Sequence, residues 1–74
     1  MIEYTQHALL RMDVRHIKES QVESTLRSPD EVIEQGDERD KYRFEKKIDN
    51  IKIVAIAYWY KEENRFKVKT VWKK

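Results

Sequence analysis

The chain has 74 residues, no cysteine and a formal net charge of +2. This length suits a single domain, residues 1–74, with a thin core, and the lack of cysteine excludes disulfides and thiolate metal sites. No apolar run approaches the roughly 20 residues of a membrane span, and the N-terminus has no signal-peptide pattern. We therefore expect a cytoplasmic protein with no membrane association.

Charge is distributed unevenly along the chain. Residues 1–40 carry five basic and ten acidic side chains, whereas residues 41–74 carry eleven basic and four acidic ones. Such a basic half suggests a polyanionic partner, of which nucleic acid is the commonest. The alternative is a lysine-rich, solvated face of a sheet, and the charge pattern leaves both interpretations open.

Two helices are predicted before the single proline. Thr5 suits the N-cap of a first helix near residues 5–14. A second helix near residues 19–28 ends before Pro29, because a residue that precedes proline disfavours helical geometry. The apolar stripes of the two helices are Ala8, Leu9 and Met12, then Val22 and Leu26.

The segments after the proline predict four strands. "EVIEQ" is a short strand, "YRFEKKI" and "IKIVAIAYWY" form a hairpin around Asp49-Asn50, and "RFKVKTVWK" follows the loop "KEEN". The expected fold class is therefore α+β, with two N-terminal helices packed on one face of a four-stranded antiparallel meander, in two layers.

The hairpins also predict which side chains share a face. With these turns, Phe44 lies opposite Ala55 and Ile56 lies opposite Lys69. The helices should cover the face that holds Tyr42, Phe44, Ile48, Ile51, Ile53, Ala55, Ala57, Trp59, Phe66, Val68, Thr70 and Trp72. The opposite face should be open and should hold Arg43, Glu45, Lys47, Lys52, Val54, Ile56, Tyr58, Tyr60, Arg65, Lys67, Lys69, Val71 and Lys73.

The expected open face has the composition of a surface that binds single-stranded RNA. Cations neutralise phosphates, and aromatic rings stack bases at about 1–3 kcal/mol each. The nucleic-acid-binding candidates are Arg43, Lys47, Tyr58, Tyr60, Arg65, Lys67 and Lys69. An equally weighted alternative is that the apolar strip on this face is covered by a partner protein or a second copy; the strip comprises Val54, Ile56, Tyr58 and Val71.

The chain also resembles a known family. The segments "YTQHALLRM", "SPDEVIE" and "VKTVWK" resemble a bacterial and archaeal domain-of-unknown-function family, number 4258, which carries His-Ala-x-x-Arg-Met, Pro-Asp and V-x-T-V in this order. Lys18 departs from the small hydroxyl residue expected as the cap of the second helix. The matching positions are His7, Ala8, Arg11, Met12, Pro29, Asp30, Val68, Thr70 and Val71.

That family looks like a relative of the RelE/ParE-type toxin superfamily. Some of those toxins cut messenger RNA on the ribosome without metal, others poison gyrase, and antitoxins mask them. The resemblance implies a RelE-like fold and two classes of partner, RNA or the ribosome and a small antitoxin-like protein. It also makes a metal-independent endoribonuclease the first candidate activity.

RNA cleavage without metal needs a base, an acid and cations around the reacting phosphate. The catalytic candidates are His7 and Arg11, one helical turn apart, together with Arg43 and Lys69. His7 and Arg11 also fit a structural role, in which they bond nearby loop carbonyls or carboxylates. Glu45 is expected in a cross-strand ion pair rather than as a base.

No metal and no cofactor are expected, because two histidines without cysteine are a poor metal signal. Two functions therefore stay open. The first is a RelE/ParE-toxin-like protein that binds RNA and is a candidate endoribonuclease. The second is a non-catalytic interaction module, which acts as a homodimer or binds a partner through the Val54/Ile56/Tyr58 strip.

Overall fold

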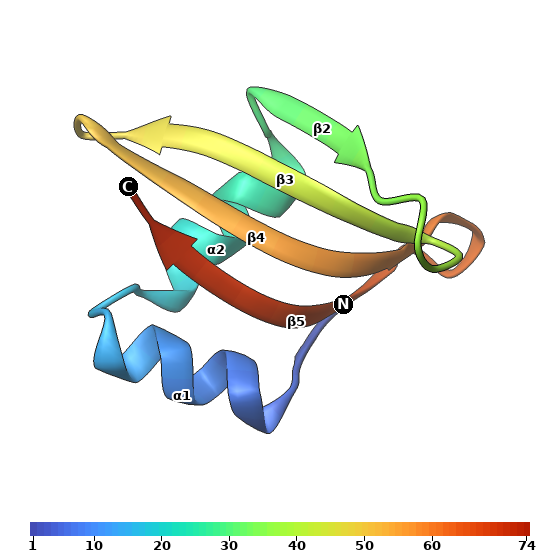
Figure 1. Cartoon of the computed structure of the whole chain (residues 1–74), viewed down its shortest axis with the longest axis horizontal. Coiled ribbons are helices and arrows are strands. Elements are labelled where there is room, and N and C mark those ends of the chain that lie inside the picture. Colours follow the sequence, from blue (N-terminus) through green and yellow to red (C-terminus); the bar gives the residue numbers. More distant parts are fainter.

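The computed structural model describes all residues 1–74, as two helices on one side of a five-stranded sheet (Figure 1). The helices are α1 (Gln6–Val14) and α2 (Glu19–Arg27). The strands are β1 (Ile2–Tyr4), β2 (Glu31–Glu34), β3 (Lys41–Ile48), β4 (Ile51–Tyr60) and β5 (Arg65–Lys73), and a 3-10 turn, η1 (Lys61–Glu63), joins the last two. The predicted α+β architecture with two N-terminal helices is confirmed.

The sheet differs from the predicted four-stranded antiparallel meander. Its strand order is β1-β5-β4-β3-β2, and β1 pairs with β5 in parallel, so the sheet is mixed. The prediction was wrong at the N-terminus, because a strand of only three residues is too short to show an alternating pattern.

Thr5 follows this strand: its hydroxyl accepts from the Ala8 amide at 3.0 Å and donates to the Lys69 carbonyl at 3.1 Å. One side chain thus caps α1, as predicted, and fastens it to β5.

Local sequence signals set the turns. Asp49 and Asn50 adopt φ angles of 50° and 67°, as a primed two-residue turn requires, and Asn64 closes η1 at φ 49°. On the helix side of β3, Lys46 donates to the Ser28 carbonyl at 2.7 Å. A lysine thereby satisfies the C-terminal end of α2, where a positive charge is favourable.

The observed register of β5 differs from the predicted one because the strand contains a β-bulge. Ile56 pairs with Thr70 and not with Lys69, so Lys69 is an extra residue without a partner on β4. The pairings between η1 and this point are as predicted. Beyond it the predicted faces were wrong, because a bulge reverses the alternation that the sequence pattern assumes. The residues that change sides are Val71 and Lys73, which turn toward the helices, and Thr70 and Trp72, which turn away from them.

The core lies between the helices and one face of the sheet. The ring of Trp59 stacks on that of Phe66, with centroids 5.7 Å apart, and Phe44 meets both rings at steep angles. No helix covers the other face (Figure 1). The buried cluster comprises Ala8, Met12, Ile17, Val22, Leu26, Phe44, Ile53, Ala55, Ala57, Phe66, Val68 and Val71.

Candidate nucleic-acid interface

The sheet face turned away from the helices, called the open face below, is built by alternate residues of three adjacent strands. Strand alternation sends every second side chain of β3 and β4 to this face, and the bulge sends two successive ones of β5 there. On these strands the face comprises Lys41, Arg43, Glu45 and Lys47 of β3, Lys52, Val54, Ile56, Tyr58 and Tyr60 of β4, and Arg65, Lys67, Lys69, Thr70 and Trp72 of β5. Its edges add Glu31 and Ile33 of β2 and Glu3 of β1.

Three aromatic side chains of the open face are half-buried: Tyr58, Tyr60 and Trp72. The guanidinium of Arg43 lies 5.3 Å from the centroid of the Trp72 ring, and that of Arg65 lies 4.4 Å from the centroid of Tyr60. These cation–π contacts fix the orientation of two of the rings. Because each ring residue also keeps exposed surface, the face offers stacking positions that are already ordered.

Glu45 of β3 neutralises two cations of this face, Arg43 on the same strand and Lys52 near the start of β4. It is only 6% exposed, accepts from Arg43 Nε at 2.6 Å and lies 3.3 Å from Lys52 Nζ. Burial raises the pKa of Glu45, but the hydrogen bonds from Arg43 and Lys52 outweigh it, and the pKa falls below its ordinary value of 4.5. Glu45 is therefore an ionised structural carboxylate and not a base held ready for RNA.

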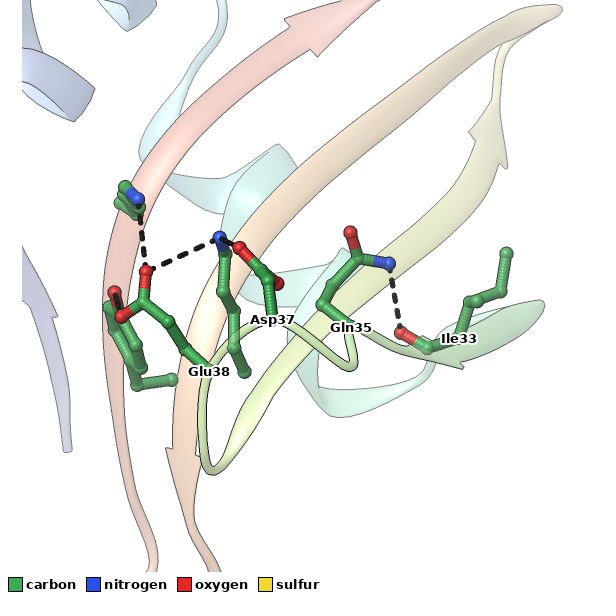
Figure 2. A network of polar contacts seen from close by, with 7 residues as sticks. Ile33, Gln35, Asp37 and Glu38 are labelled. Carbon is green, nitrogen blue, oxygen red and sulfur yellow. Dashed lines mark hydrogen bonds and ion pairs between the residues drawn. The ribbon is translucent and has the colours of Figure 1, made fainter.

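A second set of carboxylates reaches the open face from the loop between β2 and β3 (Figure 2). Asp37 accepts from Lys41 Nζ at 2.8 Å. Glu38 accepts from the Tyr58 hydroxyl at 2.5 Å and lies 3.6 Å from the ammonium groups of both Lys41 and Lys69. The Tyr58 hydrogen bond is the main cause that lowers the pKa of Glu38, and the same bond raises the pKa of Tyr58.

Near η1, Arg65 pairs with Glu3 at 2.8 Å and with Glu63 at 3.1 Å. Carboxylates of the acidic first half of the chain therefore neutralise cations of the basic second half, and the asymmetry in sequence is partly cancelled in space. Lys47 and Lys67 differ, since both are exposed and neither ammonium group has a carboxylate oxygen within 4.0 Å; only the backbone amide of Lys47 donates to the Asp30 carboxylate, at 2.8 Å.

The open face is a platform and not a cleft. Two hollows mark the surface, one between the start of α2 and the β3–β4 turn, the other beside η1. Lys47 borders the first hollow and Tyr60 the second, but neither one includes Tyr58, Lys67 or Trp72. A flat surface with ordered rings suits an extended chain of bases better than it suits a small substrate.

The apolar strip predicted on this face offers little to a partner. Val54 is 0% and Ile56 8% exposed, because charged and aromatic neighbours already cover them, and Val71 lies in the core. Among the larger exposed apolar side chains, Ile33 of β2 lies opposite Arg43 at the edge of the open face, and the others lie elsewhere: Leu9, Leu10 and Val14 on α1, and Val32 on β2.

The four catalytic candidates lie in two different layers. His7 is exposed and Arg11 half-exposed on α1, and neither side chain has a hydrogen-bond or ion-pair partner. Arg43 and Lys69 lie on the open face, across the sheet from that helix. The fold therefore does not bring the four together, and it also lacks the bonds that a structural role of His7 and Arg11 would require.

Three β3 and β5 residues of the face escaped the sequence prediction: Lys41, Thr70 and Trp72. Lys41 continues the alternation of β3 by one step beyond the predicted start of that strand at Tyr42, so the signal was present. Trp72 could not be placed from the pattern, because only the bulge at Lys69 turns it outward.

No three His, Asp or Glu side chains converge as a metal site would, and neither helix has the length and apolarity to cross a bilayer.

These features define a small two-layer α+β protein whose sheet has one face under helices and one charged, aromatic face that no helix covers. The chain belongs to the family described as domain of unknown function DUF4258, whose model matches residues 4–73. The predicted resemblance to family 4258 is thereby confirmed, while the match does not extend to the RelE/ParE-type superfamily. Neither the curated proteins nor the solved structures include a match to the chain.

Proposed function

We propose that the open face binds single-stranded RNA. The observation that carries this proposal is the set of three ordered aromatic side chains, Tyr58, Tyr60 and Trp72, beside the exposed and unpaired Lys47 and Lys67. Rings that stack bases and lysines that neutralise phosphates are the two elements that sequence-tolerant binding of single strands needs. Trp72 adds a stacking position that the sequence pattern had placed in the core.

Each element of this face has a distinct part in binding. Tyr58 and Tyr60 lie two residues apart on one side of β4, roughly 7 Å from each other along the strand, and present two neighbouring stacking positions. Lys67 lies opposite Tyr58 on β5 and is placed to neutralise the phosphate between stacked bases. Arg43 and Arg65 act mainly through the rings that they hold, since both are also bound to carboxylates.

RNA cleavage has less support than RNA binding. A base and an acid must lie within hydrogen-bond reach of the reacting groups, yet Glu45 is bound to Arg43 and His7 lies in the other layer. The order of two helices before the antiparallel strands supports a relationship to RelE/ParE-type toxins. A toxin-like role at the ribosome, masked by a small antitoxin-like protein, is consistent with that relationship and with the proposed binding face.

The direct test is fluorescence anisotropy with a labelled single-stranded RNA of about 10 nucleotides. The double variant K67A/W72A should weaken binding by about tenfold or more, because it removes one phosphate contact and one stacking contact. Arg15→Ala is the matched control, since it removes one positive charge from an exposed residue outside the open face. Equal affinities for K67A/W72A and Arg15→Ala would contradict the proposal.

A second candidate function, protein interaction, has its own observation on α1. Leu10 and Val14 lie one helical turn apart and are 59% and 60% exposed, although such side chains usually lie inside. Arg11 and Arg15 flank them without a carboxylate partner. This surface would suit an acidic amphipathic helix. The double variant L10K/V14K should abolish binding of such a peptide and leave RNA binding unchanged. Equal peptide affinities of the wild type and the variant would exclude this second function.

A further inference from the structure

Three groups of the open face converge on the single carboxylate of Glu38 (Figure 2). Lys41, Tyr58 and Lys69 come from the adjacent strands β3, β4 and β5, so the sheet holds them in fixed positions. Glu38 comes from the loop between β2 and β3, and its side chain is 44% exposed. The sheet thus supplies the binding groups, and an exposed loop supplies the anion that they bind.

The geometry around Glu38 leaves room for a better ligand. Its distance of 3.6 Å to the ammonium groups of Lys41 and Lys69 exceeds the roughly 2.8 Å of a direct charged hydrogen bond. Only the hydroxyl of Tyr58 makes a short contact, at 2.5 Å. An RNA phosphodiester presents two anionic oxygens, as a carboxylate does, and each of them can accept more than one hydrogen bond. It is not tethered to the loop as Glu38 is, so it can approach the two ammonium groups and the hydroxyl at the same time.

Departure of Glu38 would not leave a buried charge without a partner. The side chain of Lys41 is only 10% exposed, and an unpaired charge there would be costly. Asp37, however, holds Lys41 at 2.8 Å independently of Glu38. The ends of the loop are also fixed separately, by the Gln35 amide on the Lys41 carbonyl at 2.9 Å and by the Trp59 amide on the Asp40 carbonyl at 2.8 Å. Glu38 can therefore leave without disturbing the sheet.

We infer that Lys41, Tyr58 and Lys69 form a phosphate-binding site, which Glu38 fills in the free protein and leaves when an RNA phosphate enters. The inference rests on the proposed RNA binding and identifies an internal competitor for it. The affinity for RNA is then set partly by the fraction of molecules in which Glu38 is displaced. Removal of the Glu38 carboxylate should raise the affinity, although most substitutions in a binding face lower it.

The test compares two variants of equal charge in the anisotropy experiment. Glu38→Ala frees the site, whereas Glu34→Ala removes the same charge from an exposed residue of β2 without an ion pair. Glu38→Ala should bind single-stranded RNA about three- to tenfold more tightly than Glu34→Ala does, and a further Lys69→Ala should cancel this gain. Equal gains in the two variants would reduce the effect to net charge and overturn the inference, while RNA binding by the open face would stand.

A second measurement does not depend on RNA. In an NMR titration with inorganic phosphate, the signals of Tyr58 and Lys69 should shift in Glu38→Ala at concentrations that leave the wild-type protein unchanged. If these shifts occur but no variant binds RNA, the proposed function fails and the phosphate site stands. If phosphate leaves both residues unshifted in Glu38→Ala, the phosphate site is wrong, whatever RNA does.

Discussion

At the scale of single residues, Glu45 explains how a charged face can be stable. It is buried between β3 and β4, and it stays ionised because Arg43 and Lys52 both bind it. A neutral side chain at this position would leave Arg43, which is 28% exposed, without its closest partner. Arg43 would then also be less well held above the ring of Trp72. The carboxylate therefore contributes both to stability and to the order of a stacking position.

The first prediction concerns this carboxylate. Glu45→Gln should lower the free energy of unfolding by about 1–3 kcal/mol at neutral pH, because a buried hydrogen-bonded charge is lost. The folded-state pKa of Glu45 lies below 4.5, so its contribution is present above that pH and is lost as the pH falls through the folded pKa. Urea unfolding should be measured at pH 7 and at about pH 3 for both proteins. Between these two pH values the wild-type protein should lose more of its free energy of unfolding than Glu45→Gln does. An identical loss in both would contradict the role of Glu45.

The second prediction concerns Trp72. Trp72→Ala should weaken binding of single-stranded RNA about fivefold or more, whereas Trp72→Phe should keep most of the affinity, since a phenyl ring also stacks. Trp59→Phe is the matched control, because Trp59 packs on the helix side against Phe66. Anisotropy with all three variants measures this, and equal weakening by the changes at Trp59 and Trp72 would point to a loss of folding instead.

At the scale of elements, the bulge in β5 decides what the open face contains. Caps, turn residues and the alternating runs were enough to predict both helices and the hairpins, because these signals are local. Neither the bulge at Lys69 nor the short strand β1 can be recognised from the sequence. The bulge inserts one residue into an otherwise regular alternation, and β1 is only three residues long. The sequence therefore predicts the layers correctly and the final residues of β5 incorrectly.

The third prediction tests the bulge itself. Val71 is 1% exposed in the core, whereas Thr70 lies on the open face. Val71→Lys should lower the free energy of unfolding by about 3 kcal/mol or more, and Thr70→Lys by less than about 1 kcal/mol. A regular strand without the bulge would give the reverse order, so thermal or urea unfolding of the two variants distinguishes the two registers directly.

The candidate site was predictable only in part, for the same reasons. The sequence pattern grouped Tyr58, Tyr60 and Lys67 on one face, and the structure places them there. It could not show that carboxylates fold back onto this face, because the conformation of the loop that carries Asp37 and Glu38 has no periodic signature. Electrostatics inferred from sequence therefore overstated the free positive charge.

At the scale of the whole molecule, the balance between paired and unpaired charges sets the character of the open face. The β3, β4 and β5 residues of that face include seven cations, of which Lys47 and Lys67 have no carboxylate partner. Charges that are already paired release few counterions when RNA binds, so they contribute little to a dependence on salt. Stacking, which is insensitive to salt, should account for much of the affinity.

The fourth prediction follows from this balance. A plot of log K against log salt concentration for single-stranded RNA should have a slope of about −1.4, which corresponds to two phosphates neutralised by the two unpaired lysines. A slope of about −5 would be expected if all the open-face cations were free, and it would contradict the ion pairs that the structure contains. Anisotropy titrations at several salt concentrations give this slope for the wild-type protein.

The most direct test of the central claim uses the two tryptophans of the chain, which lie on opposite faces of the sheet. In an NMR titration with single-stranded RNA, the indole N–H signal of Trp72 should shift progressively, because a base stacks beside it on the open face. The indole signal of Trp59, which packs toward the helices, should stay in place. A shift of Trp59 alone, or of neither signal at saturating RNA, would show that the open face is not where RNA binds.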